Sequence, residues 1–253
     1  MSRPMRTELA PTPRELDIRT YDPAAALSSI DANVAWVLAF FAIAAVATFI
    51  YLLQSFKLAR AHEAYSSALP AVGWFAVHDL HFVLLYELWF DVYDHWWVKA
   101  WWVALVFTTL IEFALVGMIV KYGRKELAPW ASQRQFFGLI ALGTVAIGVI
   151  WLLVKDSIDD PLFLISFPIT AFWAVPFGTA LMLRRNSQRG QSTTLPICSV
   201  LIIGSFQGAL WFVDPFFQSP FFVMFSVMGI LWALANYWVL TRLPAYTAEP
   251  RAT

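Results

Sequence analysis

Apolar residues occur along this chain in long runs that short polar segments separate. A helix that crosses a membrane needs about 20 mostly apolar residues. Seven stretches meet this requirement: residues 33–56, 65–90, 100–120, 136–154, 161–183, 195–213 and 221–240. Because backbone N–H and C=O groups inside lipid must be paired within their own segment, these stretches predict helices. The pattern predicts an all-α polytopic membrane protein, a bundle of seven transmembrane helices.

Polar segments flank the predicted seven-helix domain, which covers residues 33–243. Residues 1–32 contain four prolines and no apolar core of a signal peptide, so we expect a polar N-terminal tail and a first helix that is retained. This tail is expected to be flexible or to lie along the membrane interface. Residues 244–253 are expected to form a disordered C-terminal tail.

The basic residues of the short loops predict the orientation of the bundle, because cytoplasmic loops carry an excess of Lys and Arg. The loops after the first, third and fifth helices and the C-terminal tail are basic: Lys57, Arg60, Lys121, Arg124, Lys125, Arg134, Arg184, Arg185, Arg189, Arg242 and Arg251. The opposite loops carry only Lys99 and Lys155 beside several aspartates. We therefore expect the C-terminus in the cytoplasm and the N-terminus outside, in a multi-pass protein of a bacterial inner membrane.

Composition excludes several classes of protein. Hydrophobic residues make up 60% of the chain and charged residues 13%, whereas a soluble domain has about a quarter of its residues charged. A cytosolic globular enzyme and a disordered chain are thereby excluded. The 17 basic and 17 acidic residues cancel, so no nucleic-acid partner is expected. The single Cys198 excludes an intrachain disulfide and a zinc site built on several cysteines.

Few ionisable side chains lie deep in the predicted spans, and such residues usually mark function. They are His78, Asp79 and His81 in the second span and Glu112 in the third, with Glu87 about two turns beyond Asp79. The antiparallel third helix places Glu112 at nearly the depth of Asp79. A carboxyl group in such a dry site is expected to remain protonated and to serve as a proton donor. The alternative interpretation is a hydrogen-bonded network that fixes helix packing.

The second indication of function is the number of aromatic residues: 22 Phe, 13 Trp and 8 Tyr. Trp96, Trp97, Trp101 and Trp102 are expected to be interface anchors. Deeper rings stabilise a cation when the site is dry, so an acid with aromatic walls suits protonation of an alkene or epoxide. The residues expected to line such a site are Trp74, Phe82, Tyr86, Phe113, Trp173, Gln207, Trp211, Trp232 and Asn236.

The second span resembles that of the small seven-helix integral membrane terpene cyclases of meroterpenoid and indole-terpenoid pathways. That family carries Tyr-Ser-x-Ala-Leu and, about ten residues later, Trp-Glu, whose Glu is regarded as the initiating acid. Here the first motif is Tyr65-Ser66-Ser67-Ala68-Leu69, and the same spacing reaches His78-Asp79. Ser219-Pro220 precedes the last span, as it does in relatives. The resemblance implies that Asp79 takes the role of the acid.

The chain departs from the family pattern at two positions. Phe75 and Ala76 stand where the family has an Asn before its acid, and Ala233 and Asn236 stand where a second acid lies in the last helix. In this sequence, Asp214 or Glu112 is the candidate for the role of that second acid.

The sequence therefore predicts a terpene cyclase or isomerase, metal-independent and without a cofactor, acting on a lipophilic prenylated or epoxidised substrate. Asp79 donates the proton, His78 or His81 assists, and Glu112 or Glu87 orients the acid or accepts the final proton. The alternatives are a sterol-isomerase-like enzyme, a haem protein with His78 or His81 as axial ligand, and a non-enzymatic lipid-binding, receptor or transport bundle. Asp159-Asp160 is expected to be a solvated turn rather than a magnesium site.

Overall fold

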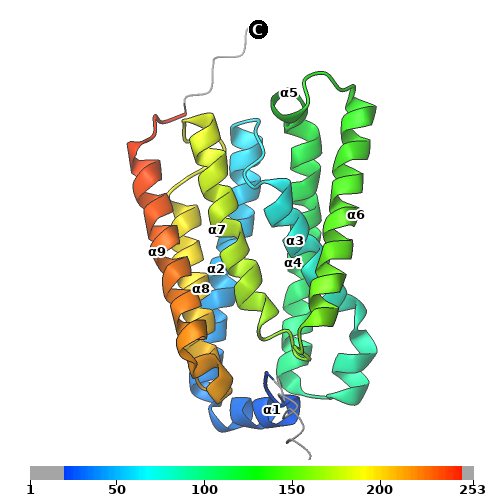
Figure 1. The fold of residues 1–253 in the computed structure, drawn as a ribbon, viewed down its shortest axis with the longest axis vertical. Helices are drawn as coiled ribbons and strands as arrows, with labels where there is room; N and C mark the ends of the chain where they lie inside the picture. Colours follow the sequence, from blue (N-terminus) through cyan, green and yellow to red (C-terminus); the bar gives the residue numbers. More distant parts are fainter. Residues whose placement is uncertain (1–19, 247–253) are drawn as a thin grey trace, which may run out of the picture.

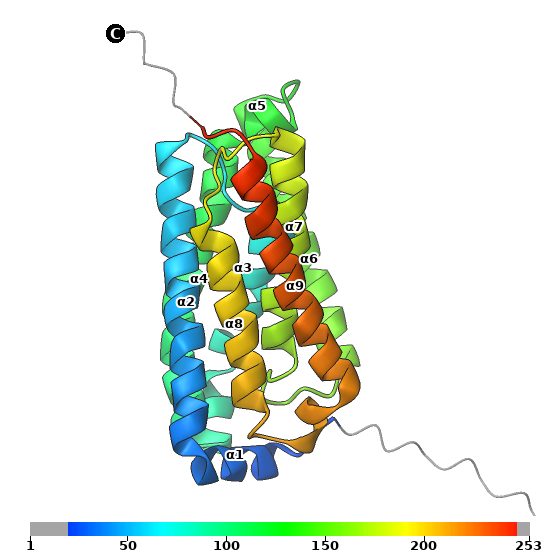
Figure 2. The ribbon, with the colours of Figure 1, turned by 90° about the vertical axis from the view of Figure 1, so that its left-hand side faces the viewer.

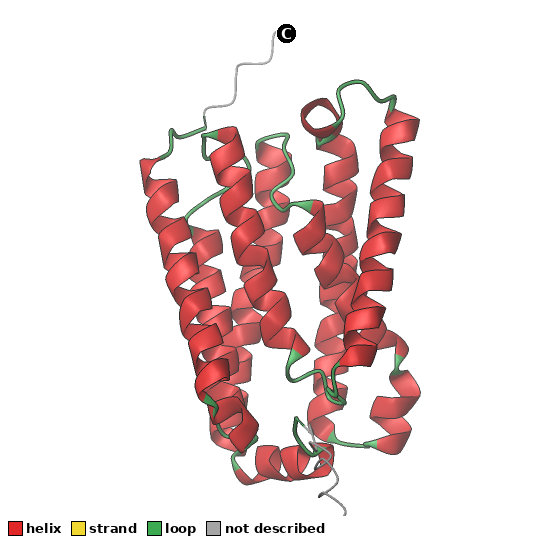
Figure 3. Cartoon of the chain, viewed as in Figure 1, coloured by secondary structure: helices red, strands yellow, loops and turns green. Residues whose placement is uncertain are grey.

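The computed structural model describes residues 20–246, and no strand occurs in that part of the chain (Figures 1 and 3). Its long helices are α2 (Val34–Ala61), α3 (Leu69–Leu84), α4 (Trp96–Tyr122), α6 (Gln133–Ser157), α7 (Ser166–Arg185), α8 (Thr194–Leu210) and α9 (Pro220–Arg242). Shorter elements are α1 (Pro23–Ala32), the π-helix η1 (Leu88–Val92), α5 (Arg124–Leu127) and the 3-10 helix η2 (Pro215–Gln218).

The long helices run along one axis in alternating directions, while α1 lies across one end of the bundle (Figures 1 and 2). Helix α2 packs against α8 and α4, α3 against α4, α6 and α7, and α9 against α8 and α7. The described chain begins at the end that α1 covers, here called the α1 end. It finishes at the opposite end, together with the basic loops (Figure 1); this end is called the basic end.

Five of the described helices are long and apolar enough to cross a membrane: α2, α4, α6, α7 and α9. The predicted all-helical membrane architecture is confirmed at that level. Helices α3 and α8 are also apolar but have only 16 and 17 residues. At 1.5 Å per residue, each is shorter than the roughly 30 Å hydrocarbon core of a bilayer.

Helix α3 is short because the predicted span 65–90 is interrupted at Leu85 and continues as the π-helix η1. Two indole N–H groups satisfy carbonyls at this interruption. Trp89 Nε1 donates to the Phe82 carbonyl at 2.6 Å, and Trp102 Nε1 donates to the Val83 carbonyl at 2.9 Å. The Trp89 ring also stacks on Phe82, with centroids 4.2 Å apart. A break inside an apolar bundle is tolerated when side chains pair the freed backbone groups in this way.

A buried carboxylate joins the N-terminal segment to the start of α7. Asp160, which is 1% exposed, accepts hydrogen bonds from Tyr21 Oη at 2.6 Å, Ile165 N at 3.1 Å and Ser166 N at 2.8 Å. Burial and the Asp160 charge raise the pKa of the Tyr21 phenol. The expectation of a solvated Asp159-Asp160 turn is therefore wrong for Asp160, because one hydroxyl and two backbone N–H groups converge on its buried carboxylate.

That segment differs from the expected polar tail in part. Residues 23–32 form α1, which starts at the N-cap Asp22 with Pro23 as its first residue. The rest of the predicted tail, residues 1–19, lies outside the described chain. The predicted C-terminal tail is described only as far as Tyr246, and Gln188 N donates to the Pro244 carbonyl at 3.0 Å.

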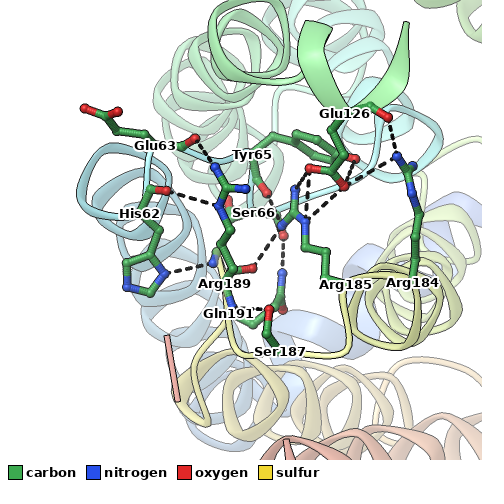
Figure 4. Close-up of polar contacts among 11 residues, drawn as sticks. His62, Glu63, Tyr65, Ser66, Glu126, Arg184, Arg185, Ser187, Arg189 and Gln191 are labelled. Atoms are coloured by element: carbon green, nitrogen blue, oxygen red, sulfur yellow. Dashed lines mark hydrogen bonds and ion pairs between the residues drawn. The ribbon is translucent and has the colours of Figure 1, made fainter. Parts of the chain in front are cut away.

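The basic end is closed by a cluster around Arg185, whose side chain is 6% exposed (Figure 4). Its guanidinium donates to both carboxylate oxygens of Glu126, with Nη2 to Oε2 at 2.9 Å, and lies 4.3 Å from the Tyr65 ring centroid. Tyr65 Oη donates to Glu126 Oε1 at 2.9 Å. Gly190, at φ +73°, lies so close to Arg185 and Tyr65 that a Cβ atom would clash with both. The cluster therefore ties the loop before α3, helix α5 and the end of α7 together.

The charges of this cluster show in its pKa values. Burial alone would raise the pKa of Glu126, but the hydrogen bonds and charge of Arg185 lower it below its ordinary value of 4.5, with Tyr65 and Arg184 assisting. Burial and the Glu126 charge raise the pKa of Tyr65 to about 12. Tyr65, which opens the motif of the predicted family resemblance, thus has a structural role here.

The Trp89 indole offers a test of the interruption in α3. Trp89→Phe keeps a ring on Phe82 but removes the N–H donor, so we expect a loss of about 2 kcal/mol in the free energy of unfolding. Trp96→Phe is the control, because Trp96 Nε1 donates to Asp31 at an exposed site and should contribute less than about 1 kcal/mol. Unfolding in detergent compares the two variants. Equal losses would contradict the role given to the Trp89 hydrogen bond.

The Arg185–Glu126 pair predicts loss of stability in acid. Because the folded pKa of Glu126 is lowered, its contribution is complete above about pH 4.5 and disappears as the pH falls through the lower folded value. Glu126→Gln should cost about 2 kcal/mol at neutral pH and flatten the acid limb of the stability curve. The control is Glu87→Gln at an exposed glutamate. Thermal unfolding across this pH range is the measurement, and an unchanged acid limb in Glu126→Gln contradicts the assignment.

Candidate functional site: a carboxyl pair in the central cavity

A cavity lies in the middle of the bundle, between α2, α3, α4, α7 and α8. It has about 70 Å³ of space for the centre of a water-sized sphere. Its polar lining includes the carboxyl groups of Asp79 and Glu112, and none of its lining residues is Lys, Arg or His. The rest of the wall is mainly aliphatic and aromatic.

Two acidic side chains from neighbouring helices meet in this cavity. Asp79 of α3 is 5% exposed and Glu112 of α4 is 3% exposed, and their carboxyl groups act on each other electrostatically. Asp79 Oδ2 accepts from Thr108 Oγ1 at 2.6 Å, and Asp79 Oδ1 lies 2.7 Å from His78 Nδ1. Glu112 Oε2 is buried and has no hydrogen-bond partner. Asp79 is therefore held on both oxygens, while Glu112 keeps a free one.

His78 lies behind Asp79, outside the cavity lining, and is 0% exposed. Its Nε2 is 3.3 Å from Ser166 Oγ, and that hydroxyl donates to the Phe163 carbonyl at 3.2 Å. Both nitrogens of the His78 ring thus face oxygen atoms, and the tautomer of the ring sets which of the two contacts it donates.

Aromatic rings form much of the cavity wall. Trp101 lies edge-on to Phe167, with centroids 5.2 Å apart, and Phe167 stacks on Phe206 at 6.1 Å. Phe49, Tyr51 and Phe75 complete the aromatic part of the lining. Trp101 was expected to be an interface anchor, but it lines the cavity because the face of α4 that carries Thr108 and Glu112 also carries Trp101.

Three residues that sequence placed with the acid lie elsewhere. His81 Nδ1 accepts from Trp151 Nε1 at 3.1 Å, and His81 lines a groove at the α1 end together with Tyr93, Lys155 and Asp156. Glu87 and Tyr86 follow the end of α3, and both are exposed. The structure does not bring these three side chains to the cavity.

The remaining residues expected to bind substrate lie around the cavity or away from it. Trp74 and Phe82 are buried in the core, and Trp74 Nε1 donates to Thr170 of the cavity wall at 3.0 Å. Phe113, Trp173, Trp211 and Trp232 are between 38% and 44% exposed on the bundle surface. Gln207 bonds to Ser226 and to the Phe217 carbonyl. Asn236 bonds to Thr179 and lines a second, smaller cavity that shares Tyr51 and Ser199 with the central one.

Sequence reasoning missed Thr108 and Ser166, which hold the two ends of the His78–Asp79 pair. Thr108 precedes Glu112 by four residues, a spacing that places both on one helix face. That spacing could have identified Thr108. No signal in the sequence identifies Ser166, because its contact depends on how α7 packs against α3.

The side chains around Asp79 do not fit a metal centre, and His78 does not fit the role of an axial haem ligand. No group of three or more His, Cys, Asp or Glu side chains among residues 20–246 could hold a metal ion. Both ring nitrogens of His78 already have partners, and the rings of Trp151 and Phe167 lie edge-on to it at 4.7 and 4.8 Å. An iron ligand at that position would have to displace a buried hydrogen bond.

Comparisons with family models, curated proteins and solved structures found no match to this chain. The terpene-cyclase resemblance of the second span therefore stays a prediction.

The hydrogen bond from Thr108 to Asp79 can be tested with a matched neighbour. Thr108→Val removes the hydroxyl with little change in shape, and we expect a loss of about 1–3 kcal/mol because Asp79 Oδ2 is left buried without a donor. Thr109→Val is the control, since Thr109 Oγ1 is buried without a partner and its removal should be neutral or stabilising. Thermal unfolding of both variants measures these changes in stability. A loss in Thr109→Val as large as that in Thr108→Val would contradict the hydrogen bond from Thr108 to Asp79.

Proposed function

We propose that this protein is an intramembrane acid catalyst, a terpene cyclase or isomerase that protonates a lipophilic prenylated substrate in the central cavity. The observation that carries the proposal is the Asp79–Glu112 pair: two buried carboxyl groups, one with an unpartnered oxygen, in an aromatic-lined cavity without a basic residue. In folded proteins the large majority of buried polar side-chain atoms have a hydrogen-bond partner. Glu112 Oε2 is not paired, which favours a site that a ligand completes.

The chemistry begins with proton transfer from the pair. Two ionised carboxylates side by side in a dry cavity repel each other, so the pair retains a proton at neutral pH. The acid O–H bond breaks and a new bond forms from that proton to an alkene carbon or an epoxide oxygen. The substrate becomes a carbocation, and the pair gains one negative charge. A neighbouring double bond closes a ring. The C–H bond on an adjacent carbon then breaks, its electrons form the product alkene, and its proton passes to Glu112, so the pair regains the proton that it gave.

The cavity wall supports this route because it favours a positive charge and keeps water away. The ring faces of Phe75, Trp101 and Phe167 offer cation–π stabilisation of up to ~2 kcal/mol in a dry site. The newly ionised carboxylate adds Coulombic attraction. A sterol-isomerase-like double-bond shift uses the same steps and differs in substrate.

The proposed setting is a seven-span bundle, with α3 and α8 as the two short crossings. The alternating directions of the long helices support it, since the described chain starts at one end and finishes at the other (Figure 1). The basic end carries Arg124, Arg185 and Arg189, which favours a cytoplasmic position for that end and for the C-terminus. An inner membrane of a bacterium is the proposed location.

Turnover by variants of the pair tests the proposal. Incubation of the purified protein with farnesylated and epoxidised prenyl acceptors, followed by mass spectrometry, should give a cyclised or isomerised product. Asp79→Asn and Glu112→Gln should each lower turnover at least ~100-fold, the usual contribution of a positioned acid, and should leave folding and substrate binding nearly intact.

The control is Asp91→Asn, which alters an exposed aspartate of η1 and should leave turnover unchanged. Binding of these acceptors without any product, in the native protein as in the variants, would contradict the enzyme and indicate a lipid-binding, receptor or transport bundle.

A further inference from the structure

We infer that Trp101 is a substrate-binding residue, whose indole N–H donates a hydrogen bond to an uncharged oxygen of the substrate. This contact lies in the central cavity about two turns of α4 away from the acid pair. The inference rests on the proposed function and names its substrate class: an elongated isoprenoid with an ether, hydroxyl or carbonyl oxygen remote from the group that is protonated.

The cavity lining contains two buried polar atoms that have no hydrogen-bond partner among the described residues. They are Glu112 Oε2 and Trp101 Nε1. Buried polar atoms are paired in the large majority of cases, because an unpaired one costs its full desolvation penalty. An indole N–H can only donate, so the partner that Trp101 lacks is an acceptor. The Glu112 oxygen belongs to the proposed acid, and the Trp101 N–H is a second polar contact available to a ligand.

The rings packed around the Trp101 indole supply no such acceptor. Their centroids lie between 5.2 and 6.1 Å from that of Trp101, and they belong to Phe41, Trp97, Phe167 and Phe206. A phenyl ring carries no nitrogen or oxygen atom, and the indole of Trp97 is itself only a donor. The acceptor therefore has to come from a ligand in the cavity.

Trp101 and the acid pair share one face of α4. The cavity-lining residues of this face follow a spacing of four, three and four: Trp101, Leu105, Thr108 and Glu112. Thr108, which donates to Asp79, lies seven residues after Trp101, or about 10 Å along the helix at 1.5 Å per residue. An oxygen held by Trp101 is therefore not the atom that the acid protonates. A ligand that reaches both groups lies along the bundle axis.

The charges of the cavity restrict this oxygen to an uncharged one. None of the lining residues is Lys, Arg or His, so a phosphate or carboxylate group would be buried without a counter-ion, which is costly. A protonated amine has no lone pair with which to accept from the indole. Ether, hydroxyl and carbonyl oxygens are the groups that remain.

Trp97 offers a matched control on the same helix. It is 2% exposed, and its Nε1 is also buried without a partner, but it does not line the cavity. Replacement of Trp97 by Phe therefore removes a similar N–H group without touching the ligand. A ligand effect that occurs at Trp101 and not at Trp97 comes from the cavity.

The indole N–H signals in NMR measure the contact directly. The full chain, labelled with nitrogen-15 in lipid nanodiscs, is titrated with farnesyl methyl ether and with the hydrocarbon in which a CH₂ group replaces the ether oxygen. The signals are identified by their loss in Trp101→Phe and Trp97→Phe. We expect the ether to move the N–H proton of Trp101 downfield, as a new hydrogen bond does. The hydrocarbon should not do so, and neither ligand should do so at Trp97.

Affinities measure the size of the effect. One hydrogen bond between neutral groups corresponds to a change of up to about tenfold in Kd. The native protein and Trp97→Phe should bind the ether tighter than the hydrocarbon by about this factor, whereas Trp101→Phe should bind the two equally. Farnesyl phosphate should bind more weakly than the ether. If Trp101→Phe does not fold, the ratio of the two Kd values in the native protein still tests the contact.

The outcomes separate this inference from the proposed function. Equal affinity for ether and hydrocarbon in the native protein would overturn the role of Trp101, and product formed from prenyl substrates would then leave the acid catalyst standing. Tighter binding of farnesyl phosphate than of the ether would overturn the uncharged substrate class. The expected shift of the Trp101 signal in a protein that forms no product would overturn the enzyme alone. Neither binding nor product would overturn both.

Discussion

The hydrogen bonds that hold the Asp79 carboxyl to His78 and Thr108 are the constraint on which the rest of this structure depends. Burying a carboxyl group in an apolar bundle is costly unless its oxygens are hydrogen-bonded. His78 and Thr108 supply those partners from two helices, at 2.7 and 2.6 Å. The register of α3 against α4 is thereby fixed, and Glu112 is brought to the same cavity with one oxygen left over.

The two ends of the bundle protect this interior in different ways. At the basic end, Arg185 and Glu126 form a charged pair that joins three segments (Figure 4). At the α1 end, the buried Asp160 carboxylate joins Tyr21 to the start of α7. The second arrangement also orients Ser166 and Phe163, so closure of that end and positioning of His78 come from the same few residues. Stability and proposed function are coupled there.

Much of the fold could be predicted from the chain, and less of the site. Long apolar runs predict helices because lipid leaves the backbone no other partner, and the deep acids stand out against so few charges. The break at Leu85 could not be predicted, since it depends on indole donors from Trp89 and Trp102 that reach back to the α3 carbonyls. Glu87 looked aligned with Asp79 only while the helix was assumed to continue. Asp160 looked solvated because its donors are mostly backbone groups and a distant tyrosine.

The protonation state of the Asp79–Glu112 pair is the property on which proton donation in the cavity depends, and it can be measured. Carbon-13 NMR of protein labelled at the side-chain carboxyls of Asp and Glu reports each group, and the signals lost in Asp79→Asn and Glu112→Gln identify the two of interest. At neutral pH we expect the pair to show one signal at the position of a protonated acid or of a shared proton. Two signals at the positions of free carboxylates would contradict it.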